Sequence, residues 1–341
     1  MAQPSKRMMD LPRKVLWILL SLFLVSSSLF VVSLSIGEPF ISLHDIYMNL
    51  VHHHPMDKIQ HLVSYEIRMP RAVIAVMAGI MLALTGSLLQ DAFQNDLAGP
   101  ELIGVSGGVS FMIAILTVFH LSVPFSMYPL VGMVGGVISG TVVIISAKGR
   151  MDKGSFILIG TAISAFLNSL VIIVITLGRQ NDISLLFFYL TGSLAGRNWS
   201  HVQNLLPWFL IFVPIALLCS RILNVMKLGD DAAKGRGVPV VNMRVFLLLI
   251  GVGLIASVVA NCGPIGFISL LAPHITKKLL NSENAYFVLP VSALIGGVLL
   301  LSADFLLRVI FYPYEMPVGL LTTIIGGITL LFFLRQRRRT V

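Results

Sequence analysis

Long apolar runs, separated by short polar or glycine- and proline-containing breaks, dominate the chain. A membrane-spanning α-helix needs about 20 consecutive apolar residues, so these runs predict about ten membrane segments. The expected segments are 15–34, 72–90, 102–120, 128–147, 155–177, 205–221, 245–262, 264–276, 289–307 and 318–334. The pattern therefore predicts an all-α, polytopic membrane protein with one transmembrane domain over residues 1–341.

The first and the eighth of these segments could have been something other than ordinary spans. The first apolar run is longer than the roughly 7–15 residues of a signal-peptide core, and no small-residue cleavage site follows it, which favours an uncleaved first span. The segment 264–276 is too short to cross a bilayer unaided. We expect it to be re-entrant or tilted against a broken neighbour, which is tolerated where protein buries the backbone.

The polar break at 227–244, KLGDDAAKGRGVPVVNMR, separates two long apolar runs. Its pattern predicts one short helix. The signals in chain order are the turn residue Gly229, the N-cap candidate Asp230, the first-turn Asp231, the helix formers Ala232 and Ala233, and the closing Lys234 and Gly235. Pro239 prevents continuation. Since such a short helix is marginal in water, the membrane domain or a soluble partner must hold it.

Composition agrees with a membrane protein, because 56% of the residues are hydrophobic and only 11% are charged. The net charge of +9 could indicate nucleic acid, but the position of the basic residues matters more in a membrane protein. Most of the 24 lysines and arginines lie near the termini and within 148–153, 221–244 and 277–278. By the positive-inside rule, both termini and the 227–244 loop are cytoplasmic, and no nucleic acid is expected.

Neither a metal site nor a disulfide is expected. The outer loop from 37 to 67 carries the histidines His44, His52, His53, His54 and His61. Adjacent side chains do not converge on one ion without irregular backbone, and no carboxylate or cysteine stands at a ligand-like spacing, so a solvated loop is favoured. Cys219 and Cys262 are expected near opposite faces, roughly 30 Å apart. No cofactor is predicted.

Gly104–Gly108 matches the G-x-S-x-G pattern of serine hydrolases, with Ser106 as nucleophile and His274 as a possible base. An intramembrane serine protease is therefore one alternative. However, the pattern works catalytically in a strand–turn–helix, which a membrane helix does not provide. Small residues also let membrane helices approach closely, so packing is the favoured interpretation and no catalytic residue is predicted.

Asp304 is the clearest charge within a predicted span, and intramembrane carboxylates are usually functional. A proton-coupled secondary transporter is thus a second alternative, although it should carry such carboxylates in several spans. Asp304 stands one helical turn before Arg308, which favours a local ion pair between them. Arg68 and Arg71 lie on the side where the positive-inside rule disfavours basic residues, which indicates a specific anionic partner.

Six blocks resemble the FecCD-type permeases of ATP-binding-cassette (ABC) importers for iron–siderophore, haem and cobalamin. They are RMPRAVIAVMAGIMLALTGSLLQ (68–90), NDLAGPELIGVSGG (95–108), LGDDAAKGRGV (228–238), GPIGFISLLAPHI (263–275), LPVSALIGGVLLLSADFLLR (289–308) and EMPVGLLTTIIG (315–326). The chain departs from the family at Asp96, where proline is usual, at Lys277, where arginine is usual, and at Ile328, where proline is usual.

The resemblance implies a type II ABC importer permease with cobalamin-importer-like architecture in a bacterial cell membrane. Two permease subunits would enclose the path, an ATP-binding-cassette ATPase dimer would lie on the cytoplasmic face, and an extracellular substrate-binding lipoprotein would deliver a ferric chelate. The sequence contains no G-x-x-x-x-G-K-[ST] pattern, so a partner would hydrolyse ATP and this chain is not expected to be an enzyme. The chelate, and whether the second permease is identical or a paralogue, stay open.

The resemblance also implies roles for particular residues. Arg68, Arg71 and Arg308 would bind the substrate-binding receptor. Gln90, Asn95 and Ser106 would line the translocation path and its gate, and the turn at 148–154 would lie on the same face. The alternative role of Asn95 is to cap a helix. ATPase coupling falls on the 227–244 loop, at Leu228, Gly229, Asp230, Asp231, Ala232, Ala233, Gly235 and Val238.

Overall fold

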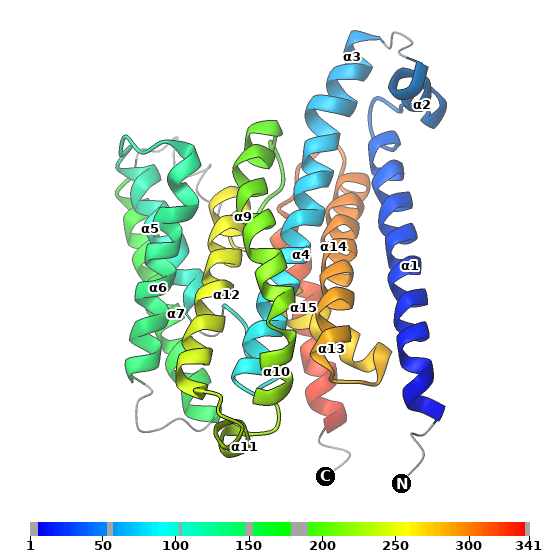
Figure 1. Ribbon diagram of the computed structural model, residues 1–341. Coiled ribbons are helices and arrows are strands. Elements are labelled where there is room, and N and C mark those ends of the chain that lie inside the picture. The colour runs from blue at the N-terminus through cyan, green and yellow to red at the C-terminus, as the bar shows by residue number, and fades with distance from the viewer. Residues whose placement is uncertain (1–5, 53–56, 102–103, 147–152, 179–189, 338–341) are drawn as a thin grey trace.

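The computed structural model describes residues 6–52, 57–101, 104–146, 153–178 and 190–337, and these residues form helices without any strand (Figure 1). Seven of the described helices are long and apolar enough to cross a membrane. The all-α, polytopic fold expected from the apolar runs is confirmed.

Each expected membrane segment overlaps a helix. The long elements are α1 (Lys6–Ser35), α4 (Met69–Ala92), α5 (Val105–Val118), α6 (Tyr128–Ser146), α7 (Lys153–Thr176), α9 (Trp199–Leu218), α12 (Val240–Cys262), α13 (Ile268–Leu280), α14 (Ala285–Ile310) and α15 (Val318–Arg337). The short elements are α2 (Leu43–His52), α3 (Lys58–His61), the π-helical turn Leu62–Arg68, the 3-10 turn Phe125–Met127, α10 (Ser220–Met226) and α11 (Asp230–Gly235). We call the two ends of the bundle the α2 end and the α11 end (Figure 1).

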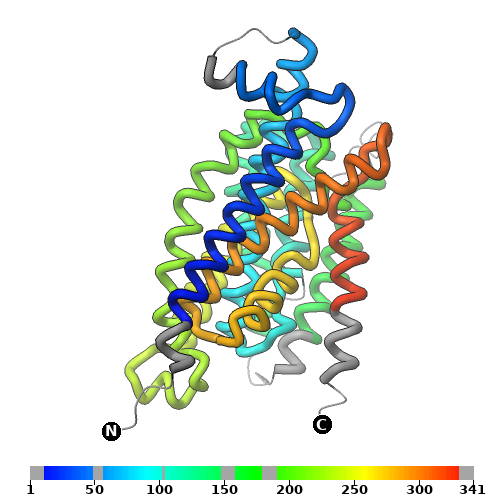
Figure 2. The backbone as a smooth tube through the Cα atoms, turned by 90° about the vertical axis from the view of Figure 1, so that its right-hand side faces the viewer, coloured from blue at the N-terminus to red at the C-terminus, as the bar shows by residue number. Residues whose placement is uncertain are grey.

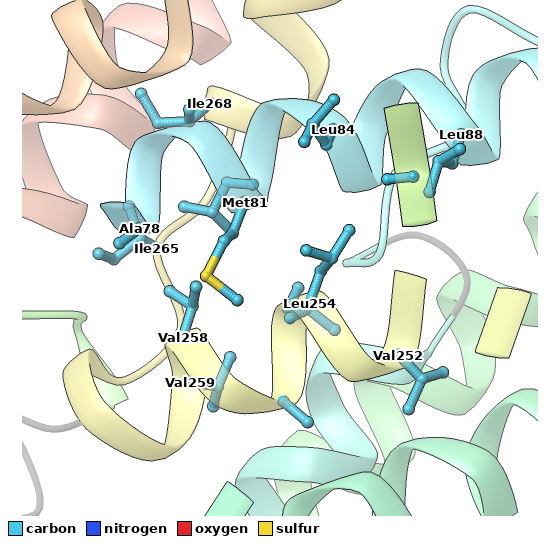
Figure 3. Close-up of a cluster of buried hydrophobic side chains, with 14 of the residues drawn as sticks. Ala78, Met81, Leu84, Leu88, Val252, Leu254, Val258, Val259, Ile265 and Ile268 are labelled. Carbon is cyan, nitrogen blue, oxygen red and sulfur yellow. The ribbon is translucent and has the colours of Figure 1, made fainter. Parts of the chain in front are cut away.

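Helices α4 and α12 form the centre of the bundle and are buried along most of their length, whereas α1 lies at the edge and is largely exposed. Figure 3 shows Met81 of α4 pointing towards Val258 of α12, with Leu84 of α4 and Leu254 of α12 in the same cluster. All four side chains are fully or almost fully excluded from solvent. Figure 2 shows α1 running alongside α14 at the periphery.

Helices α4 and α14 run antiparallel in backbone contact. A Cβ atom added at Gly79 would lie 2.3 Å from the carbonyl oxygen of Gly296, and one added at Gly296 would lie 2.3 Å from that of Gly79. Only glycine permits this approach, which is the usual way that membrane helices gain packing energy. Nearer the α11 end, Ser87 Oγ donates a hydrogen bond to Ser292 Oγ at 3.1 Å.

Non-helical backbone crosses part of the bundle before α13, as expected for the short segment 264–276. Residues 263–267 are not helical, and α13 begins only at Ile268. The neighbouring irregular backbone at 192–193 is paired with the helices around it: Ser193 N donates to Cys262 O at the end of α12 at 2.8 Å, and Gly319 N of α15 donates to Gly192 O at 2.9 Å. Such pairing is what irregular backbone needs at membrane depth. Cys219 and Cys262 are both buried and free.

Candidate functional site

Arg71 of α4 binds Asp304 of α14 in a buried ion pair at the α2 end. Arg71 Nη2 lies 2.8 Å from Asp304 Oδ1, and Nε lies 3.0 Å from both carboxylate oxygens. Glu315, which is exposed, adds a longer contact of 3.4 Å to Nη1. The expectation that Asp304 pairs with Arg308 is therefore wrong. Helix α4 packs beside α14 and places Arg71 next to the carboxylate instead.

Arg68 and Arg308 hold the end of α1. The last carbonyls of a helix have no partner within the helix, and α1 has no basic residue in its final turn. Arg68 Nη1 donates to Leu34 O at 2.8 Å and to Ser35 O at 3.1 Å, while Arg308 Nη2 donates to Ser33 O. Two arginines from other elements thus stabilise the negative end of this helix.

The three arginines gather at one end of the bundle, but Arg68 and Arg71 do not form an outward-facing surface. Their exposed fractions are only 4% and 6%, and their donors bind the protein itself. Arg308 is partly exposed and lies over the ring of Phe305, 5.9 Å from its centroid. Its Nε is buried and has no hydrogen-bond partner among the described residues. Of the three, Arg308 is the most accessible to another molecule, because Arg68 and Arg71 are buried.

At the α11 end, four charged side chains form what we call the inner ion cluster: Asp91, Asp96, Lys227 and Lys277. Lys227 Nζ lies 2.9 Å from Asp91 Oδ2, and Lys277 Nζ lies 3.2 Å from Asp91 Oδ1. Lys277 Nζ also lies 3.1 Å from Asp96 Oδ1. The Asp91 side chain is 2% exposed and the Asp96 side chain 57% exposed, so one cluster joins a buried carboxylate to a surface one.

Residues on both sides of α11 bind the end of α4. Arg244 Nε donates to Ala92 O at 2.9 Å, and its Nη2 lies 2.7 Å from Asp230 Oδ1. Gln94 Nε2 donates to Met226 O at 2.7 Å. The expectation that Asp230 caps α11 is wrong: Gly229 stands at the N-cap with φ 102°, and Asp230 is the first helical residue.

The short helix α11 is held on one side only. Ala233 is completely buried against the rest of the chain, whereas Asp231, Ala232 and Gly235 are exposed. Leu228 before the helix is also exposed, and Val238 after it is partly buried. A Cβ atom added at Gly235 would meet nothing within 4 Å, so the exposed side is open.

The expected gate residues lie around the end of α4. Gln90 is almost fully buried, and the backbone N–H of Asn95 donates to its carbonyl at 2.9 Å. With Gln94 in the left-handed region at φ 49°, this bond closes α4 in the manner of a Schellman motif. The Asn95 side chain accepts from Leu97 N at 2.9 Å. Ser106 is buried in the first turn of α5, while 148–152 of the expected neighbouring turn lie outside the described residues.

The geometry disfavours both alternative functions. Gly104–Gly108 begins α5, and no strand precedes it in the described part of the chain. Within the described helices, the buried carboxylates are Asp91 and Asp304, which lie at opposite ends of the bundle in ion pairs. His53 and His54 of the histidine run lie outside the described residues.

The sequence pattern missed most of the inner ion cluster. The predicted span 72–90 ends one residue before Asp91, and the sequence pattern assigned no role to this carboxylate. Asp96 and Lys277 were noted as separate departures from the family pattern. Their separation of 3.1 Å shows that they belong to one contact, which only their proximity in space could reveal.

The described residues thus form a bundle of membrane helices with buried ion pairs at both ends. Residues 22–336 match the FecCD transport family, and the chain belongs to that family of integral membrane permeases. Its role is therefore that of a transport subunit.

Curated relatives match along most of the chain. The Fe(3+)-citrate import system permease protein YfmE of Bacillus subtilis (strain 168) is 36% identical over 336 residues, covering 96% of this chain and 97% of that protein. The Fe(3+) dicitrate transport system permease protein FecD of Escherichia coli (strain K12) is 37% identical, covering 78% and 82%. The Iron(3+)-hydroxamate import system permease protein FhuG of Bacillus subtilis (strain 168) is 32% identical, covering 81% and 84%.

The fold also matches a solved structure. An inward-facing conformation of a metal-chelate type ABC transporter aligns with a TM-score of 0.81 at 28% identity, covering 94% of this chain and 99% of that chain. The expected type II ABC importer permease architecture is confirmed.

Proposed function

We propose that this permease passes a ferric chelate of the siderophore or citrate type into the cytoplasm, driven by ATP that a partner hydrolyses. The observation that carries this proposal is α11, a helix held on one side by its own chain and open on the other, in a protein of the FecCD transport family. The substrate class rests on the iron chelates named for the relatives.

The protein lies in a bacterial cell membrane with both termini and α11 in the cytoplasm. The excess of lysine and arginine near the α11 end supports this orientation. An ATP-binding-cassette ATPase dimer then binds the exposed side of α11, where small residues such as Ala232 and Gly235 leave room for a cleft to close around the helix.

A substrate-binding lipoprotein docks at the opposite, extracellular end. Arginine suits this task because its planar fork binds carboxylates bidentately. Arg308 makes the contact with receptor carboxylates, and Arg68 and Arg71 support it from inside the protein by holding α1 and α14.

A second permease subunit, identical or a paralogue, completes the translocation path. Support comes from α15, which packs mainly on α13 and α14 and leaves Leu320, Ile324 and Ile328 exposed. Gln90, Asn95 and Ser106 lie near the cytoplasmic exit of this path, where polar groups can part and close again.

The test is reconstitution of the permease in liposomes with its ATPase and binding protein. Ferric citrate and a ferric hydroxamate, each with radioactive iron, serve as probes. We expect uptake of at least one probe that requires ATP and stops when the ATPase carries a Walker-A lysine-to-alanine substitution. Uptake driven by a proton gradient without ATP would instead identify a secondary transporter.

A further inference from the structure

We propose that the inner ion cluster is a two-part coupling device, in which Asp91 is a fixed anchor for the ATPase-contacting loop and Asp96 is a releasable latch on the α4–α5 connection. This inference rests on the proposed function. Asp91 and Asp96 act as positioning residues, because they hold other elements in place and need not touch the transported chelate.

The anchor is defined by burial. Asp91 lies near the C-terminal end of α4, and its side chain is 2% exposed. Lys227, which precedes the turn into α11, binds Asp91, and Lys277 of α13 binds it as well. Separating a buried pair leaves an uncompensated charge in the protein, so these contacts persist while the helices move together.

The latch is defined by exposure. Asp96 shares Lys277 with Asp91, but its side chain is 57% exposed. Water can solvate this carboxylate as soon as the contact breaks, so releasing it costs little. Lys277 keeps its bond to Asp91 in either state, so Lys277 itself has one permanent contact and one releasable contact.

The ATPase-contacting loop is attached to the same point from its other side. Arg244, which follows α11, binds the carbonyl of Ala92 and the carboxylate of Asp230. Lys227 and Arg244 therefore bracket α11 and both hold the end of α4. A displacement of α11 by the ATPase reaches α4 directly through these two contacts, as a rigid-body movement rather than a chemical signal.

The movement reaches the proposed gate through the next residues along the chain. The backbone of Asn95 is bonded to Gln90, so the α4–α5 connection begins at the anchored helix end. Asp96 fixes the following turn to Lys277 on α13. When the anchored end of α4 turns about the persistent Asp91–Lys277 contact, the exposed Asp96 contact breaks first and the connection opens.

A cysteine reporter in this connection tests the proposal. Leu97→Cys is introduced into the permease–ATPase complex in lipid nanodiscs, and its labelling by a maleimide is timed without nucleotide and with ATP plus vanadate. The natural cysteines are both buried, which limits background labelling. The matched control is Lys14→Met, since Lys14 binds Leu279 O of α13 at the same end but has no place in the cluster.

We expect the reporter's labelling rate to change several-fold with nucleotide in the parent and in Lys14→Met. With Asp96→Asn the rate is fast in both states, because the latch is already released. With Asp91→Asn the rate no longer depends on nucleotide, although ATP is still hydrolysed. Nucleotide dependence that is unchanged in Asp91→Asn, or a parent complex that hydrolyses ATP without any change at the reporter, would overturn the proposal.

Two controls separate other causes of failure. If Asp91→Asn does not fold, the double variant Asp91→Leu with Lys227→Met replaces one buried contact by apolar packing, which proteins often tolerate. Loss of folded protein in both variants would overturn the proposal, because the cluster would then serve folding alone. A parent chain that binds no ATPase would contradict the proposed function itself.

Discussion

Arg71 on α4 and Asp304 on α14 form a buried, bidentate ion pair at the end of the bundle opposite α11. The two helices are in backbone contact at Gly79 and Gly296, so the pair closes one end of an antiparallel helix couple. The other end of α4 carries Asp91 in the inner ion cluster. Charge therefore fixes this central helix at both ends.

Removing one partner of the Arg71–Asp304 pair should destabilise the fold. Arg71→Met leaves the Asp304 carboxylate buried without its main partner, and breaking such a pair typically costs about 3–5 kcal/mol. We expect a clear fall in the melting temperature of the detergent-purified permease. The double variant Arg71→Met with Asp304→Leu should regain most of the loss.

Lys234→Ala is the comparison for that experiment, because Lys234 forms an exposed ion pair with Asp231 at 3.6 Å. Exposed pairs contribute little, so its melting temperature should match that of the parent. Equal melting temperatures for Arg71→Met and Lys234→Ala would contradict a stabilising role for the buried pair.

Reversal of the partly exposed Arg308 should weaken the affinity for the binding protein and should affect folding less than reversal of Arg68, because Arg308 holds only the carbonyl of Ser33 at the end of α1. We expect Arg308→Glu to lower the affinity for the substrate-binding protein at least about tenfold, as removal of a charge-paired contact commonly does. Arg68→Glu should instead reduce the yield of folded permease, since Arg68 holds the carbonyls of Leu34 and Ser35. Surface plasmon resonance with nanodiscs measures the first effect. Unchanged affinity in Arg308→Glu would rule out this docking residue.

Neighbouring alanines on α11 should respond in opposite ways to a bulky side chain. Ala232 is exposed, so Ala232→Trp should leave the permease folded but weaken ATPase binding or separate ATP hydrolysis from uptake. Ala233 is fully buried, so Ala233→Trp should overpack the loop, which typically costs about 1–3 kcal/mol. Co-purification of the ATPase and the melting temperature distinguish the two. Normal binding, hydrolysis and uptake in Ala232→Trp would show that α11 is only a connector.

Glu101, in the connection between α4 and α5, should make stability depend on pH. Burial raises the pKa of its carboxyl from 4.5 to about 7, although the hydroxyl of Ser269 opposes the shift. The folded protein thus holds this proton more tightly than the unfolded chain, so the stabilisation is present below about pH 4.5 and is lost as the pH rises towards 7. Glu101→Gln should remove this loss. Melting curves of both proteins across this range measure the difference, and parallel curves would contradict the assignment.

The apolar runs alone determined the all-α, polytopic class, because a helix that crosses a membrane needs about 20 apolar residues and the chain contains many such runs. Local turn chemistry also located α11: Gly229 permits the turn, Ala232 and Ala233 favour the helix, and Pro239 follows it. These features depend on residues that are close in sequence. Only the exact first residue of the helix differed from the prediction.

The partners of the charged residues could be decided only by the tertiary structure. Arg308 is one turn from Asp304 in sequence, yet Arg71 binds that carboxylate because α4 packs beside α14. Asp91 and Lys277 meet because α13 also packs on α4. Helix order within a bundle is set by close contacts such as Gly79 with Gly296, which depend on shape across distant segments and leave no periodic signal in the sequence.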